Sequence, residues 1–270
     1  MTPALVYLAL FYFAPLAVML GFSFLHFSNY TFVGPISLAN YIDILTTPSY
    51  QGVFVRTVFL SLVASVIAVG LAYPFTYVIT FVYPARSSVL YFSILVCLFG
   101  GYLVRVYAWR TILGAEGVIN GSLMSLGIID TPWRWMLNSS FAVVLTTSNF
   151  LVPLAVVPLY SAMQNVSPRL LEAARDLGSS PLDVSRRIVL PLVNRGLIVS
   201  LVFCFIASAG EFAIPSLLGG IETSFVGNHI QFQVQSTGDW PLGATMAVYL
   251  VVVVVAFAAL GAWLVRRGLR

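Results

Sequence analysis

The stretch VFVRTVFLSLVASVIAVGLAYPFTYVITFV, residues 53–82, decides the fold class, because Arg56 is its one charged side chain. An apolar run of about 20 residues is long enough to cross the roughly 30 Å hydrocarbon core of a membrane as a helix. The chain holds six such runs, which predict an all-α polytopic membrane protein with six transmembrane helices. The runs are Pro3–Phe27, Val53–Val82, Ser88–Leu113, Phe141–Met163, Gly196–Leu218 and Leu242–Val265.

The composition supports the same class. The 270 residues are 60% hydrophobic and 8% charged, whereas soluble domains carry about 25% charged residues. No shift in composition marks a soluble domain, so residues 1–270 are expected to form a single transmembrane domain. The first run has no basic lead and exceeds the apolar core of about 7–15 residues found in signal peptides. It is therefore interpreted as a retained helix.

The basic residues are all arginine, and their distribution predicts the orientation. With both termini cytoplasmic, nine arginines lie inside and four outside, as the positive-inside rule requires. The inside set is Arg86, Arg169, Arg175, Arg186, Arg187, Arg195, Arg266, Arg267 and Arg270, and the outside set is Arg56, Arg105, Arg110 and Arg134. We expect a multi-pass membrane protein with both termini cytoplasmic. No basic stretch is interleaved with exposed aromatics, so nucleic acid is not an expected partner.

Catalytic and metal chemistry find little support. The chain has no lysine, so it lacks a phosphate-binding loop of the G-x-x-x-x-G-K-[ST] kind. Cys97 and Cys204 fall inside apolar runs and are expected to pack there, and His26 and His229 lack the helical spacing of a zinc pair. We therefore expect no catalytic residue and no metal site. An intramembrane hydrolase would need a buried nucleophile with a base, and neither histidine is placed for it.

The loop 164–195 is the one long charged segment. Ser167 and Pro168 predict a helix start, with a cap residue followed by proline at the first helical position. An apolar stripe follows at helical spacing, and Gly178 is suited to end the helix. The stripe consists of Leu170, Ala173, Ala174 and Leu177.

A second helix is predicted to start at Ser180, with Asp183 completing a capping box. Two short helices joined at a glycine make a compact projection whose small residues allow a partner's groove to approach closely. The alternative is an amphipathic hairpin that lies on lipid with its arginines on anionic headgroups. On physical grounds alone, docking to a protein is the favoured interpretation.

The spacing E-A-A, three residues, G, nine residues, I-x-L-P resembles the signature of permease subunits of type I ABC importers. It is met at Glu172, Ala173, Ala174, Gly178, Ile188, Leu190 and Pro191. Within that family the chain is most similar to the first permease of spermidine/putrescine importers. Supporting residues are Tyr107-Ala108-Trp109-Arg110, Gly210-Glu211-Phe212 and Asp239-Trp240-Pro241. Permeases for aminoethylphosphonate, opines or amino-acid derivatives are similar, so the solute class stays open.

The resemblance implies alternating access coupled to a separate ATPase through the loop. The implied partners are two cytoplasmic ATPase subunits carrying ATP and Mg, a second homologous permease that is more often different than identical, and an external substrate-binding protein. This chain would bind no cofactor itself. The implied ATPase-coupling residues are Leu170, Glu172, Ala173, Ala174, Arg175, Asp176, Leu177, Gly178 and Ser180.

An acid inside a membrane run is a functional candidate, and Glu211 is that residue. It is expected either to meet a cationic solute or to pair with Arg105 or Arg110. Tyr107 and Trp109 offer ring faces to an ammonium group, although such rings are more often interfacial anchors. A self-contained ion-coupled carrier is the competing class, but it would show several buried acids and related half-repeats.

Residues 114–138 form an outer connection with two tryptophans near its end, Trp133 and Trp135. Apolar residues at near-helical spacing predict a short helix at the outer membrane interface, where indole rings settle at headgroup depth. A surface anchor and a docking face for an external partner are equally compatible with this pattern.

Overall fold

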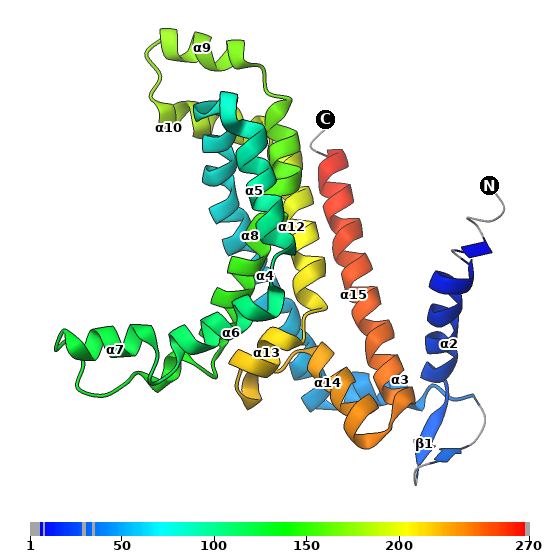
Figure 1. Cartoon of the computed structure of the whole chain (residues 1–270). Coiled ribbons are helices and arrows are strands. Elements are labelled where there is room, and N and C mark those ends of the chain that lie inside the picture. The colour runs from blue at the N-terminus through cyan, green and yellow to red at the C-terminus, as the bar shows by residue number, and fades with distance from the viewer. Residues whose placement is uncertain (1–5, 8, 29–30, 34–35, 268–270) are drawn as a thin grey trace.

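The long helices of the computed structural model form an elongated bundle with shorter helices at both ends (Figure 1). The structure describes residues 6–7, 9–28, 31–33 and 36–267. The main helix of each of the six predicted runs is α2 (Ala14–Ser23), α4 (Pro48–Tyr77), α5 (Ser87–Phe99), α8 (Ser140–Gln164), α12 (Asn194–Ala209) or α15 (Trp240–Arg267). The other helices are α3 (Ala39–Thr46), α6 (Tyr102–Leu113), α7 (Val118–Ser125), α9 (Pro168–Asp176), α10 (Pro181–Asp183), α11 (Leu190–Leu192), α13 (Ala213–Leu218) and α14 (Val226–Phe232).

Single turns and two strands complete the chain. The π-helical turns are η1 (Ala9–Phe13), η2 (Val78–Val82), η5 (Val184–Val189) and η7 (Gln233–Thr237). The 3-10 turns are η3 (Pro84–Arg86), η4 (Arg134–Met136) and η6 (Ile221–Thr223). Strands β1 (His26–Ser28) and β2 (Thr31–Val33) pair antiparallel, with His26 opposite Val33. This two-stranded ladder is the one sheet in the described part of an otherwise helical chain.

The two ends of the bundle differ. Helices α9 and α10 lie together at one end, and α3, α7, α13, α14 and β1 lie at the other (Figure 1). Helix α7 projects sideways from the bundle. The loop 164–195 and the outer connections are therefore at opposite ends of the long helices, as the predicted topology requires.

Small residues hold α4, α8 and α12 together. Ala64 of α4 and Ala155 of α8 are buried in the shared core, where short side chains let helix backbones approach closely. Two serines add bonds between helices: the Ser148 hydroxyl donates to the Ala64 carbonyl at 3.2 Å, and the Ser200 hydroxyl donates to the Ala155 carbonyl at 3.0 Å. The central bundle is thus joined by backbone-directed bonds as well as by packing.

Three of the six predicted crossings are continuous helices. Among the described residues, 48–82, 140–164 and 240–267 are each long and apolar enough to cross a membrane, and counting each of two bent helix pairs as one span gives up to five. Helix α2 is a shorter apolar helix. Part of the first predicted run lies outside the described residues, and its described part ends as helix at Ser23.

The third and fifth runs were wrongly predicted as continuous. Ser88–Leu113 breaks at Gly100 and Gly101, where the chain between the α5 and α6 segments bends by 80°. Gly101 has φ 57°, a left-handed conformation that glycine adopts without a steric penalty. In the predicted run Gly196–Leu218, helix α12 ends at Ala209, and a separate helix, α13, begins at Ala213.

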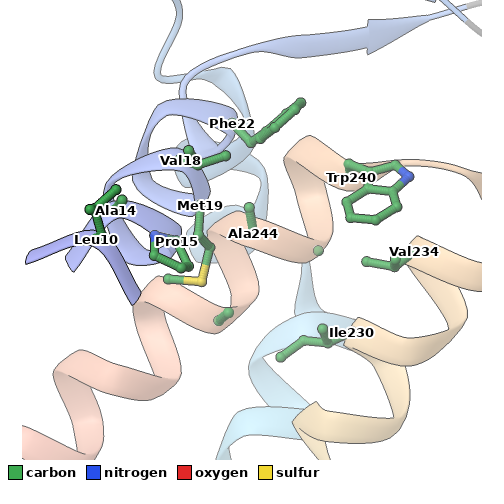
Figure 2. A pocket seen from close by; sticks show the side chains of 12 residues that line it. Leu10, Ala14, Pro15, Val18, Met19, Phe22, Ile230, Val234, Trp240 and Ala244 are labelled. Carbon is green, nitrogen blue, oxygen red and sulfur yellow. The ribbon is translucent and has the colours of Figure 1, made fainter. Parts of the chain in front are cut away.

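The first and last long helices of the described chain, α2 and α15, lie against each other. Helix α2 packs on α15, and the hydroxyl of Thr245 in α15 donates to the carbonyl of Ser23 at 3.0 Å. An apolar groove of about 490 Å³ lies between α2, α14, η7 and α15 (Figure 2). Val18 and Met19 line it from α2, and Ile230 and Trp240 line the opposite side.

Candidate functional site: the coupling hairpin and the helix breaks

The first helix of the loop begins where the sequence predicts. Pro168 is the first residue of α9, and Ser167 is at the cap position. The Ser167 hydroxyl makes no capping bond among the described residues, so the predicted side-chain cap is absent there. Proline alone, with φ already suited to a helix and no amide to satisfy, marks the start.

Gly178 reverses the chain after α9. Its φ is 82°, in the left-handed region. The Gly178 amide donates to the Arg175 carbonyl at 2.9 Å, and the Ser179 amide donates to the Ala174 carbonyl at 3.0 Å. These bonds satisfy carbonyls that the helix end would leave free. The turn between the two helices of the loop therefore depends on this glycine.

The second helix has a capped start, but only half of the predicted capping box. The Ser180 hydroxyl accepts a bond from the Asp183 amide at 3.2 Å and donates to the Asp183 carboxylate at 2.6 Å. That carboxylate also forms an ion pair with Arg187 at 3.2 Å. Both groups are exposed, so the ion pair adds little stability. The helix continues through η5 and α11 to Leu192 before the chain bends by 73° into α12.

We call residues 167–192 the coupling hairpin, after the role that the family resemblance implies for them. Its inner side is a small apolar core in which Leu171 and Ala174 pack with Val184. Leu171 is 4% exposed and Ala174 is 8% exposed. On the bundle side, the Tyr73 hydroxyl of α4 bonds to the Ser185 carbonyl and to its hydroxyl, each at 2.9 Å. The hairpin is thus fixed to a membrane-spanning helix.

The predicted stripe does not form one face. Ala174 points inward beside Leu171, while Leu170 is 51% exposed and Leu177 is 88% exposed. Ala173 is exposed between them. The physical reason is that Leu171, which the stripe omitted, fills the core and rotates α9 accordingly. The outward face therefore combines exposed apolar and small side chains at the end of the molecule beyond the membrane helices.

Charged residues surround this outward face. Glu172, Arg175 and Asp176 are exposed, and none of them forms an ion pair with another described residue. Exposed large apolar side chains rimmed by free charges are typical of a surface that binds another protein.

A second candidate region lies at the break between α5 and α6. Arg105, one turn into α6, donates through one guanidinium nitrogen to the carbonyls of Cys97 and Gly100, the latter at 3.4 Å. The Trp109 indole donates to the Asn149 side-chain oxygen at 3.3 Å. A helix C-terminus carries partial negative charge, so the Arg105 cation is favourable at this position.

A cavity of about 480 Å³ opens beside the break and brings together residues of four helices, α4, α5, α6 and α8. It is lined by Ile67, Leu71, Phe75, Cys97, Arg105, Trp109, Leu145, Ser148, Asn149, Val152 and Pro153. Arg105 and Trp109 meet there as pathway candidates, while Tyr107 is 52% exposed and Glu211 lies elsewhere. Cys97 is exposed rather than packed, so its predicted packing role is wrong, whereas Cys204 is fully buried as expected.

Glu211 has a different environment from the one predicted. It lies in the break between α12 and α13, not inside a continuous helix. One carboxylate oxygen accepts from the Phe212 and Ala213 amides at 3.0 and 2.8 Å and from the Tyr102 hydroxyl at 2.6 Å. Among the described residues it pairs with neither Arg105 nor Arg110. Glu211 starts α13 and ties it to α6.

Sequence reasoning missed Asn149, Tyr102 and Tyr73. Asn149 could have been found from the sequence, because an amide inside the apolar run Phe141–Met163 needs a hydrogen-bond partner in the membrane. Tyr102 and Tyr73 gave none, because their partners Glu211 and Ser185 are more than a hundred residues away in sequence.

The apolar groove beside α2 is a poor candidate for a polar solute. Figure 2 shows aliphatic, methionine and aromatic side chains converging on it, with the Trp240 ring nitrogen as the polar side-chain atom among the labelled residues. A charged solute would lose its hydration there without compensating hydrogen bonds.

Broken membrane helices beside a solute-sized cavity are typical of membrane transport proteins. A family described as "Binding-protein-dependent transport system inner membrane component" matches residues 1–269, and the chain belongs to this family. It is a non-catalytic permease subunit of an ABC importer and resembles polyamine permeases.

Individual relatives agree with this classification. The chain is 34% identical over 248 residues to the spermidine/putrescine transport system permease protein PotB of Escherichia coli K12, covering 92% of this chain and 90% of that protein. It is 32% identical over 247 residues to PotB of Haemophilus influenzae, covering 91% and 86%.

Solved structures show the same fold. A bacterial alginate ABC transporter with its alginate-bound periplasmic protein matches with a TM-score of 0.77 at 16% identity, covering 98% of this chain and 92% of that one. The inward-facing MetNI methionine ABC transporter matches with a TM-score of 0.59 at 17% identity, covering 80% and 94%.

Proposed function

We propose that this chain forms half of the translocation pathway of an ATP-driven importer for a small cationic solute such as spermidine or putrescine. The observation that carries the solute class is the 34% identity to a spermidine/putrescine permease over 92% of the chain. The single domain 1–270 would span the inner membrane with both termini cytoplasmic. The described arginines of the inside set support that orientation, and Arg270 lies outside the described residues.

The coupling hairpin would dock into a cleft on a cytoplasmic ATPase subunit that holds ATP and Mg. Two properties support this role: the outward face of α9 is exposed and partly apolar, and the Tyr73–Ser185 bonds join the hairpin to α4. Motion of the ATPase would therefore be transmitted to a spanning helix. Two ATPase subunits, a second and different permease, and an external binding protein would complete the complex.

The docking is tested by Leu177→Asp, which places a charge on the outward face at an 88% exposed position. We expect loss of ATP hydrolysis stimulated by the loaded binding protein, while membrane insertion stays normal. The matched control is Ile36→Asp, 80% exposed near α3 at the opposite end of the bundle, which should retain stimulation. Equal stimulation in both variants would reject docking through this face.

A solute other than a polyamine is a second candidate. The putative 2-aminoethylphosphonate permease PhnU of Salmonella typhi is 33% identical over 118 residues, 43% of this chain. Competition against putrescine uptake in proteoliposomes separates the two: unlabelled spermidine should compete, and aminoethylphosphonate should not. The opposite pattern would assign the phosphonate class.

A further inference from the structure

The break after α5 leaves helix carbonyls at membrane depth. Helix α5 has 13 residues, about 20 Å at helical rise, so starting from the hairpin end of the bundle it stops short of the roughly 30 Å hydrocarbon core. Carbonyl groups without a donor are costly at that depth. Arg105 supplies the donors, bonding the carbonyls of Cys97 and Gly100.

We infer that the Cys97 and Gly100 carbonyls bind an ammonium group of the solute. In the solute-free protein the Arg105 guanidinium occupies these two acceptors, and the ammonium group displaces it. This rests on the proposed import of amines. An ammonium group has three donors, and the Asn149 side-chain oxygen on the wall of the same cavity offers a third acceptor. The Trp109 ring adds an aromatic face for a cation.

The residues that line the cavity favour displacement of Arg105 by the solute over occupancy of the cavity by both cations. No acidic side chain of the described chain lines the cavity, so two cations there would repel each other with nothing to neutralise them. Arg105 is only partly buried and has a long flexible stem, so it can leave the carbonyls. Neutral acceptors with a resident competitor bind a cation weakly enough to release it again, which transport requires.

Cys97 provides a native probe of this site. It is exposed and lines the cavity, whereas Cys204 is fully buried, so a thiol reagent reports on the cavity. The experiment measures the rate at which N-ethylmaleimide modifies Cys97 in the assembled complex in detergent without nucleotide. Putrescine is the test ligand, 1,4-butanediol is its uncharged control, and Cys97→Ser defines the background.

We expect putrescine, but not butanediol, to slow the modification of Cys97. In Arg105→Ala the competitor is gone, so protection should occur at about tenfold lower putrescine concentration if Arg105 occupies its acceptors about 90% of the time. Guanidinium ion should protect Cys97 in Arg105→Ala and have little effect on the parent. Arg105→Gln, which keeps donors without charge, should also bind putrescine more tightly than the parent.

Equal protection by putrescine in the parent and both Arg105 variants, or equal protection by butanediol, would overturn the inference. If Arg105→Ala fails to assemble, Arg105→Gln and Asn149→Leu decide, the latter by losing protection. Labelling needs neither ATP nor transport. A parent that shows protection but accumulates no putrescine in proteoliposomes therefore contradicts the proposed function and leaves the binding site standing.

Discussion

Replacing Gly178 by alanine should weaken the turn of the coupling hairpin without a steric clash. The φ of Gly178 is 82°, and an added Cβ would meet no atom within 4 Å. The cost is therefore that of holding a residue with a side chain in the left-handed region, about 1–2 kcal/mol. That cost lowers the ratio of formed to opened turn by about 5- to 30-fold. We expect a corresponding loss of coupling between solute and ATP hydrolysis.

The assay is ATP hydrolysis by the reconstituted complex, with and without loaded binding protein. Gly178→Asn is the matched variant, because asparagine tolerates the left-handed region, and it should retain most of the stimulation. Gly70→Ala, inside α4 with open space around its Cβ position, should leave coupling unchanged, since alanine is the better residue in a helix interior. Full stimulation in Gly178→Ala, or equal damage by alanine and asparagine, would refute the backbone argument.

Three further predictions concern the outer end and the helix breaks. Glu211→Gln should be mild because an amide oxygen still accepts the Tyr102 and backbone bonds, whereas Glu211→Ala should lower thermal stability by about 1–3 kcal/mol through unpaired donors; equal stability would contradict the capping role. Asn120→Ala breaks bonds to the Gly114 carbonyl and the Trp133 amide, so amide hydrogen exchange across residues 114–136 should accelerate, unlike in the exposed Ser122→Ala. Burial, with Arg56 nearby, lowers the pKa of His229 below its usual value of about 6.5, so the unfolded chain binds more protons and stability is lost as pH falls from that value through the folded pKa. His229→Gln should therefore reduce the dependence of the melting temperature on pH between about pH 5 and 7. An unchanged slope would exclude His229 as the source of that dependence.

Signals that act within a few residues were readable from the sequence of the loop. Pro168 starts α9, Gly178 ends it and Ser180 starts α10, as expected, because each satisfies or removes a neighbouring backbone group. Which side of α9 faces inward was not readable. Leu171 and Ala174 turn inward because they pack against residues that follow the turn and against the bundle, and a local apolar stripe does not contain that information.

At the two helix breaks, as in the loop, local features could be read from the sequence but the packing partners could not. Gly100 and Gly101 were visible in the sequence, but the apolar run around them fits a straight crossing equally well. The bonds from Arg105 to the end of α5, which help to stabilise the break, required the fold. Glu211 was recognised as unusual inside an apolar run. Its role as the start of α13 depends on Tyr102, which lies on another helix. Polar residues could thus be flagged from sequence, while their partners required the fold.

The packing of α2 on α15 has a consequence for biosynthesis. The Ser23 carbonyl receives its bond from Thr245, which the ribosome adds more than two hundred residues later. Through most of translation α15 does not yet exist, so the side of α2 that later packs on α15 must be covered by lipid, by the insertion machinery or by a chaperone. A chain that ends before α15 would leave that side of α2 without its partner helix, so an unfinished subunit differs from the complete one at this surface.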